Sequence, residues 1–219
     1  MKFIPFDYNK RQDEIIESII IFVYEHLCKW RDDPVRRKEK NERILNSDLP
    51  KFLTTNAHKA ELGLNFYPEE PQENQRTIDI SVCYNDISCY NKVIAVFECK
   101  RLSAEINGNR KDEYVTGHKE TSGGIQRFKL EAHGKEFNTV SMIGYIQSGT
   151  YNEWFNKING IIEKLCDKPD ENKLTWTKNE LLNLVENDNK NGKHHSKSVH
   201  LRNNKTEIKI HHLWVDMQL

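Results

Sequence analysis

The chain has 219 residues, of which 37% are hydrophobic, and its 33 basic side chains balance its 33 acidic ones. This length predicts one domain, and the composition excludes a disordered chain. Zero net charge argues against indiscriminate binding to nucleic acid, although it leaves room for local basic patches. The sequence shows neither an apolar signal-peptide core nor the roughly 18 consecutive apolar residues that suggest a membrane span. The five cysteines form no CxxC pair, so we expect reduced thiols in a cytoplasmic protein without a membrane partner.

The first third of the chain is predicted to be helical. Residues 10 to 30 carry apolar side chains at helical spacing and predict an amphipathic helix. Residues 34 to 46 predict a short basic helix that begins at Pro34. A further helix is expected to start at a cap, Ser47 or Asp48, and to end at Gly63. The stretch "YPEEPQENQ" that follows predicts a polar loop broken by prolines.

The middle of the chain changes to the pattern of strands. "TIDISVCY", at residues 77 to 84, alternates apolar and polar side chains. "KVIAVFECKRL", at 92 to 102, is a continuous apolar run of the kind found in buried strands, and "TVSMIGYIQS", at 139 to 148, predicts a third strand. Between the last two, residues 112 to 132 are expected to be partly helical, with an interruption at Gly123 and Gly124.

The last third combines helices with a hairpin. Residues 152 to 166 and 177 to 188 each predict a helix. "KSVHLR" and "TEIKIHHLWVD" predict a hairpin around a turn at Asn203 and Asn204. We therefore expect a single α/β domain (α+β type) over residues 1–219, with a helical part at 10–63, a core at about 64–150, and helices and a hairpin at 151–219. Its centre is expected to be a mixed β-sheet flanked by helices.

Three charged side chains mark the two adjacent predicted strands of the core. Glu98 and Lys100 project to one face of their strand because side chains two residues apart share a face. Asp79 lies on the polar side of the preceding strand, about 5 Å away if the strands are hydrogen-bonded neighbours. Two adjacent carboxylates favour a hard divalent ion such as Mg²⁺ or Mn²⁺. A lysine beside that ion positions a water or stabilises charge at phosphorus, so the set suits phosphodiester hydrolysis.

Asp79 followed by Glu98-Cys99-Lys100 at the end of a hydrophobic strand resembles the PD-(D/E)XK nuclease superfamily. The resemblance implies a restriction-endonuclease-like fold and Mg²⁺- or Mn²⁺-dependent cleavage of nucleic acid. It implies that Asp79, Glu98 and the backbone carbonyl of Cys99 bind the metal and that Lys100 acts on the water. The sequence departs from the motif at Ile78, which stands where the family name has a proline.

A looser resemblance connects "FECKRL", "EYV", "GGIQRF" and "SMIGYI" to small PD-(D/E)XK proteins of bacterial defence loci. It implies that Gln126 and Arg127 point from the following helix toward the active site and contact nucleic acid. It also implies a DNA endonuclease that serves as effector of an antiviral or restriction system. A protein partner or a homo-oligomer would then control its activity.

Plainer interpretations stand beside these. Asp79 also fits a solvated strand residue, and Glu98 with Lys100 a surface ion pair, but the apolar run that precedes the charged pair favours the nuclease interpretation. Residues 190 to 210 hold six basic residues against one acidic residue, so His200 and Arg202 belong either to a phosphate-binding face or to a solvated hairpin face. The chain as a whole is either a nuclease or a non-catalytic module that keeps the fold to bind nucleic acid or a partner subunit.

Other charged and aromatic residues have plainer interpretations too. The basic stretch "VRRKEKNER" is either a contact for a nucleic-acid backbone or an exposed helix with ion pairs. We expect the glutamates of the first helix to be solvated and the four tryptophans to pack in the core. The C-terminal histidines show no zinc-type spacing. The glutamates concerned are Glu14, Glu17 and Glu25.

Overall fold

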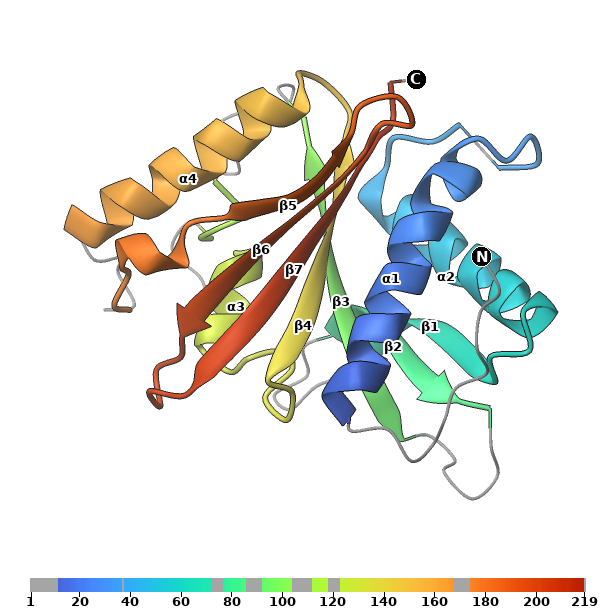
Figure 1. The fold of residues 1–219 in the computed structure, drawn as a ribbon, viewed down its shortest axis with the longest axis horizontal. Coiled ribbons are helices and arrows are strands. Elements are labelled where there is room, and N and C mark those ends of the chain that lie inside the picture. Colours follow the sequence, from blue (N-terminus) through green and yellow to red (C-terminus); the bar gives the residue numbers. More distant parts are fainter. Residues whose placement is uncertain are drawn as a thin grey trace.

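The computed structural model describes residues 12–36, 38–71, 77–85, 92–103, 112–117, 123–167 and 174–218. Its centre is a seven-stranded sheet in the order β1-β2-β3-β4-β7-β6-β5 (Figure 1). The β3–β4 and β4–β7 pairs are parallel and the other pairs are antiparallel, so the predicted mixed sheet flanked by helices is confirmed. The strands are β1 (Leu64–Pro71), β2 (Thr77–Tyr84), β3 (Val93–Leu102), β4 (Thr139–Ile146), β5 (Asn183–Asp188), β6 (Lys193–Leu201) and β7 (Glu207–Asp216). The helices are α1 (Gln12–Arg31), α2 (Glu42–Lys59), α3 (Gly124–Lys129) and α4 (Tyr151–Asp167), with a 3₁₀ turn at Lys178–Glu180.

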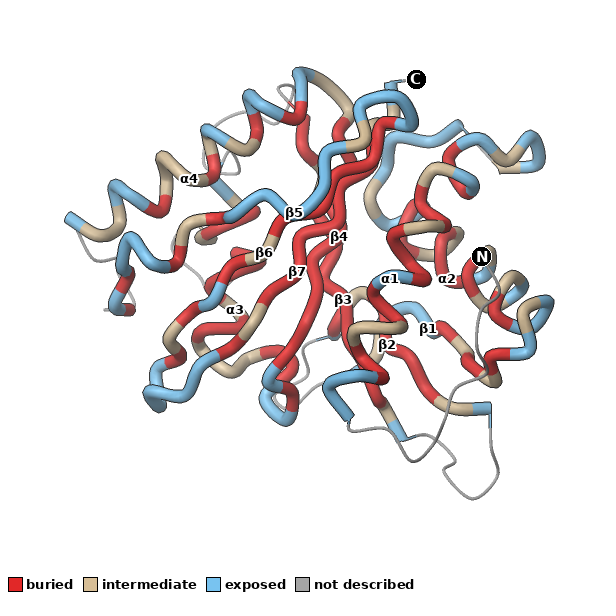
Figure 2. The backbone as a smooth tube through the Cα atoms, viewed as in Figure 1, coloured by how far each residue is buried: buried red, intermediate tan, exposed pale blue. Residues whose placement is uncertain are grey.

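Helices cover both faces of the sheet. Tyr24 of α1 contacts His195 of β6, whereas Tyr151 of α4 stacks on His194. Because consecutive strand residues point to opposite faces, α1 and α4 lie on opposite sides of the sheet (Figure 1). Strands β3, β4 and β7 form the buried middle of the molecule, and β5 is an exposed edge (Figure 2). The described tryptophans, Trp30, Trp154, Trp176 and Trp214, are all buried, as predicted.

The N-terminal helices differ from the prediction. The first, α1, is confirmed. The described residues between 34 and 41 are not helical, and a single helix begins at Glu42 and runs through Pro50. Its cap is Asn41, whose side-chain oxygen accepts a hydrogen bond from the backbone N–H of Arg43. The proposed cap Asp48 instead lies inside the helix, where its carboxylate accepts a 2.9 Å hydrogen bond from the Trp30 indole. Capping by Asn41 therefore sets the helix start more strongly than Pro34 does.

Two edge strands were not predicted. The supposed loop at residues 67 to 75 is, as far as Pro71, the exposed half of β1. The helix predicted for residues 177 to 188 is a 3₁₀ turn followed by β5. Each edge strand pairs with one neighbour only, so its side chains lack the regular alternation of a half-buried strand. Prolines also tolerate an edge, where one row of N–H groups needs no partner.

The predicted central elements are confirmed. Strands β2, β3 and β4, helix α4 and the β6–β7 hairpin lie where the patterns placed them. Of the helix expected within residues 112 to 132, the described parts (112–117 and 123–132) contain the six residues of α3. Four cysteines of the described chain, Cys28, Cys83, Cys99 and Cys166, are free.

Candidate active site

The candidate site lies where β2 and β3 separate. Their antiparallel pairing runs as far as Ile80 opposite Phe97, and Asp79 and Glu98 are the next residues along. Beyond this point the Asp79 carboxylate, in place of a backbone carbonyl, accepts a hydrogen bond from β3: the Cys99 backbone N–H donates to its Oδ2 at 2.7 Å. The two strands thus separate at Asp79 and Glu98, and the Asp79 carboxylate lies between them. We call this place the fork.

A second carboxylate, Glu42, occupies the same open edge of β3. The first residue of α2, it accepts a 2.8 Å hydrogen bond from the Arg101 backbone N–H through Oε2. Sequence reasoning missed Glu42 because the expected helix boundaries hid it. The signal was present: an asparagine followed by an acidic residue is a typical helix start, and acidic side chains are favourable in a first turn.

The backbone of β3 adds an oxygen to this edge. Along a strand, the N–H and C=O groups of one residue point to the same side, and successive residues alternate. The N–H groups of Cys99 and Arg101 face the fork, so the Cys99 carbonyl faces it too. Asp79, Glu42 and the Cys99 carbonyl therefore present oxygens along one strand edge. The Cys99 side chain itself is buried.

Glu98 is surrounded by the side chains of two cations and a histidine. Its Oε1 lies 2.8 Å from the Lys100 Nζ and accepts a 2.6 Å hydrogen bond from Arg127 of α3. Its Oε2 lies 3.0 Å from Nδ1 of His133, in the loop after α3. The Glu98 side chain is fully covered. The structure therefore brings Asp79, Glu98, Lys100 and Arg127 together, and it adds His133, which no sequence pattern singled out.

The charges of Glu98 and Lys100 stabilise one another. Burial opposes ionisation of Glu98, but Lys100, His133 and Arg127 outweigh it and hold the pKa of its carboxyl far below the usual range. Burial likewise opposes a charged lysine, but Glu98 and Asp79 raise the pKa of Lys100 well above its usual value. Lys100 is therefore an ammonium donor at neutral pH, and Glu98 is a carboxylate.

Asp79 behaves in the opposite way. Burial, together with the nearby charge of Glu98, raises its pKa from 3.8 to about 7. Lys100 and the Cys99 N–H favour the ionised form but do not offset the burial. Asp79 thus exchanges a proton near neutral pH, as expected for a buried carboxylate beside a second one.

The donor set fits a small, hard divalent ion. Mg²⁺ in proteins is commonly held by one or two carboxylates and keeps several waters or substrate oxygens. Asp79 and Glu98, with the Cys99 carbonyl and Glu42 nearby, offer such a set. Within the described ranges, no group of three or more His, Cys, Asp or Glu side chains forms a ready-made cage. The arrangement thus suits an ion that shares its coordination with water and substrate.

The other predicted nucleic-acid contacts lie away from the fork. Gln126 is buried, and its side-chain oxygen accepts a hydrogen bond from the Gly117 N–H. His200 is fully covered between Ser198 and Glu180. Arg202 donates to the Gly134 and Phe137 carbonyls in the interior.

The face of β6 that carries His200 and Arg202 is therefore the buried one, and neither alternative given for it is correct. These polar side chains point inward because they meet Glu180 of the 3₁₀ turn and the Gly134 and Phe137 carbonyls in the loop after α3, whereas Val199 on the other face is exposed. These two side chains offer no phosphate-binding surface.

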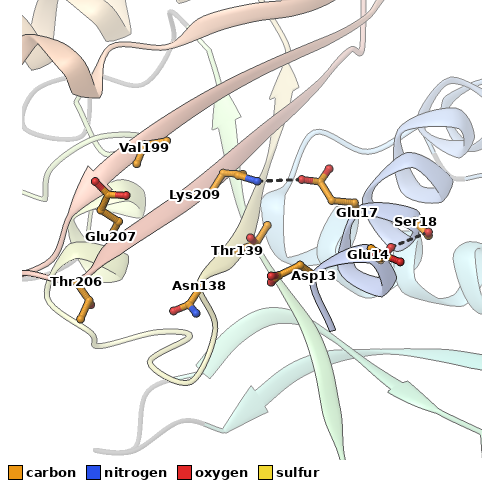
Figure 3. A pocket seen from close by; sticks show the side chains of 10 residues that line it. All are labelled: Asp13, Glu14, Glu17, Ser18, Asn138, Thr139, Val199, Thr206, Glu207 and Lys209. Atoms are coloured by element: carbon orange, nitrogen blue, oxygen red, sulfur yellow. Dashed lines mark hydrogen bonds and ion pairs between the residues drawn. The ribbon is translucent and has the colours of Figure 1, made fainter. Parts of the chain in front are cut away.

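A hollow near the start of α1 is a different environment. Asp13, Glu14 and Glu17 line it from α1 and Glu207 from β7, and Lys209 lies 3.3 Å from Glu17 (Figure 3). Behind it, Nε2 of His211 lies 3.2 Å from Glu17. Excess acidic charge makes this hollow unfavourable for a phosphate backbone.

No family model, curated protein or solved structure matches the chain. None of the helices in the described part is long and apolar enough to cross a membrane.

Proposed function

We propose that this chain is a metal-dependent nuclease of the PD-(D/E)XK kind that hydrolyses phosphodiester bonds. The observation that carries the proposal is the fork between β2 and β3, where the Asp79 carboxylate bonds the Cys99 N–H beside the Glu98–Lys100 pair. Gathering acidic and basic side chains in a largely covered place costs free energy, so such a cluster often marks a functional site. Strands hold them in fixed positions, which suits catalysis.

The residues divide the chemistry between them. A bound Mg²⁺ or Mn²⁺ supplies a polarising charge for the phosphoryl group and lowers the pKa of a water. Asp79, Glu98 and the Cys99 carbonyl hold and orient that ion. Lys100 donates hydrogen bonds to the attacking water or to the phosphoryl oxygens, since its raised pKa makes it a poor proton acceptor. Asp79, whose pKa is about 7, binds metal best in its ionised form.

We further propose DNA as the substrate and a protein partner or a second copy of the chain as the controlling element, possibilities that rest on the sequence resemblance alone. The free cysteines of the described residues suit a reducing, cytoplasmic setting. A role in antiviral defence or restriction is the corresponding biological proposal.

The test is cleavage of plasmid DNA and of RNA by the purified chain with Mg²⁺ or Mn²⁺. Lys100→Met keeps the buried stem and removes the ammonium, and we expect the rate to fall about 100-fold or more. Lys178→Met is the control, since it removes the charge of an exposed lysine. EDTA should abolish cutting. Equal cutting by wild type and Lys100→Met would show that the active site lies elsewhere.

The second candidate function is a non-catalytic module that binds nucleic acid or a partner. One observation favours it: Glu98 is fully covered and already engaged by Lys100, Arg127 and His133. Calorimetric titration with Mn²⁺ separates the two. If the chain is a nuclease, wild type binds Mn²⁺ and Asp79→Asn does not. If neither protein binds Mn²⁺, with or without DNA, the result favours the non-catalytic module.

A further inference from the structure

Arg127 and Lys100 together occupy one carboxylate oxygen of Glu98, a residue proposed above to bind the metal. Glu98 Oε1 receives Arg127 at 2.6 Å and Lys100 at 2.8 Å. A carboxylate oxygen accepts about two hydrogen bonds, so Oε1 is saturated. The side chain is also fully covered. A divalent ion therefore cannot reach this oxygen unless one of the two cations withdraws.

Arg127 is the more exposed of the two cations at this oxygen. Lys100 rises from the middle of the sheet and is 11% exposed, whereas the Arg127 side chain is 23% exposed. The short helix beneath Arg127 is held in place, because the Gly124, Ile125 and Gln126 N–H groups bond the carbonyls of residues 113 to 115. A change of the Arg127 rotamer would therefore leave these backbone hydrogen bonds in place, and such changes are fast for partly exposed side chains.

Charge balance gives the same answer. An arriving divalent ion would meet two side-chain cations at one carboxylate oxygen, and like charges at such distances repel strongly in a covered site. An arginine that leaves the carboxylate has a matching partner at hand in a substrate phosphate, since its planar fork pairs with both groups in the same geometry.

We propose, on the basis of the nuclease function above, that Arg127 is an exchangeable counter-ion: it holds the metal's place at Glu98 and passes to a substrate phosphate when the ion binds. Metal and nucleic acid then bind cooperatively, because each favours the same displaced position of Arg127. The metal-free chain is held in a state with low metal affinity. Arg127 becomes a substrate-binding residue only in the loaded enzyme.

The experiment is calorimetric titration of Mn²⁺ into the full chain at pH 8, without nucleic acid. Arg127→Met and Arg127→Gln both remove the competing charge, and the glutamine keeps hydrogen-bond donors at the position. We expect both to bind Mn²⁺ about fivefold tighter or more. Lys135→Met, which removes an exposed charge in the loop after α3, should leave the affinity unchanged. Thermal unfolding confirms that each variant is folded.

Cleavage provides the second readout. In both Arg127 variants the Mn²⁺ concentration for half-maximal cutting should fall, and the maximal rate should fall as well because the phosphate loses a partner. Unchanged or weaker Mn²⁺ affinity in folded variants would overturn the inference and leave Arg127 as a group that merely orients Glu98. In that case metal-dependent cutting by wild type would still uphold the nuclease. Tighter binding without any cutting would uphold the exchange and contradict the nuclease.

Discussion

Asp79 carries an energetic cost in the metal-free protein. Its ionised form is disfavoured by burial and by Glu98, which raise the pKa to about 7. A carboxyl whose pKa is raised on folding adds no cost below its ordinary value of 3.8, and the cost grows until the pH passes the raised value. A side chain that weakens the fold at working pH is typical of a site kept for a ligand.

The first prediction concerns Asp79→Asn in EDTA. The variant keeps an oxygen for the Cys99 N–H and removes the buried charge. At pH 8 we expect it to be more stable than wild type by about 1–2 kcal/mol, less than the full pKa shift implies because the buried amide also has a desolvation cost. At pH 4 the difference should vanish, since wild-type Asp79 is then largely protonated. Chemical denaturation at both pH values measures this. A variant that is less stable at pH 8 would contradict the burial argument.

His133 is a residue of the candidate site that could not be predicted from the sequence. Asp79, Glu98 and Lys100 were found because charged side chains interrupt a strand pattern, and Arg127 through the resemblance. His133 follows α3 in an irregular loop and reaches Glu98 only through tertiary packing, so no local periodicity marks it. Glu42 was hidden for a related reason: its helix start depends on a single cap, Asn41, within a run of charges.

At the scale of elements, burial decides what the sequence reveals. Central strands such as β3 are covered on both faces and read as apolar runs, and α4 reads as a regular amphipathic helix. Edge strands give weaker signals. In strand β5 both Leu184 and Val185 are exposed, so apolar side chains do not alternate with polar ones there. The sequence pattern of this segment therefore resembles that of a helix, and pairing with β6 makes it a strand. Propensity yields to tertiary context at both edges of this sheet.

A chain of buried polar groups connects α3 to the C-terminal hairpin. Glu180 receives Lys129 at 2.5 Å and lies 3.0 Å from His200. The second nitrogen of His200 lies 2.7 Å from the Ser198 hydroxyl, which also contacts His212. Burial opposes the charge of Glu180, but His200 and Lys129 lower its pKa. This carboxylate therefore stabilises the fold above its ordinary pKa, and the contribution is lost as pH falls below it.

The second prediction is that Glu180→Ala destabilises the protein by about 3–5 kcal/mol at pH 7, because it leaves the Lys129 ammonium buried without its carboxylate. Glu180→Leu combined with Lys129→Met should recover part of that loss, since it removes both charges and keeps volume. Chemical denaturation measures the stability of wild type and of both variants. Glu207→Ala, at an exposed glutamate, is the control and should change stability by no more than about 0.5 kcal/mol. Equal loss in the single and double variants would show that packing, not charge, dominates.

Over the whole molecule, a balanced net charge conceals separated charges. The acidic hollow lies at the start of α1. The basic segment, defined as Lys38, Lys40 and Arg43, follows the end of α1 and is exposed. The length of α1, roughly 30 Å for its 20 residues, separates the two. The basic segment leads directly to Glu42, and a 2.7 Å hydrogen bond from Gln147 to the Lys40 carbonyl holds it beside the end of β4. If the chain is the nuclease proposed above, this segment would favour substrate phosphates on one side of the fork.

The last prediction follows from this separation. Changing Lys38, Lys40 and Arg43 together to glutamine should weaken nucleic-acid binding at low salt, because up to three phosphate contacts and their released counter-ions are lost. The slope of log affinity against log salt should become shallower by about 2–3. Fluorescence anisotropy with a labelled DNA duplex, between low and moderate salt, gives both quantities. The matched control removes three other exposed lysines, Lys178, Lys190 and Lys205. If both triple variants lose the same affinity, the overall positive charge of the protein, and not the basic segment, accounts for binding. If only the first variant loses affinity, nucleic acid contacts the start of α2 on its way into the fork.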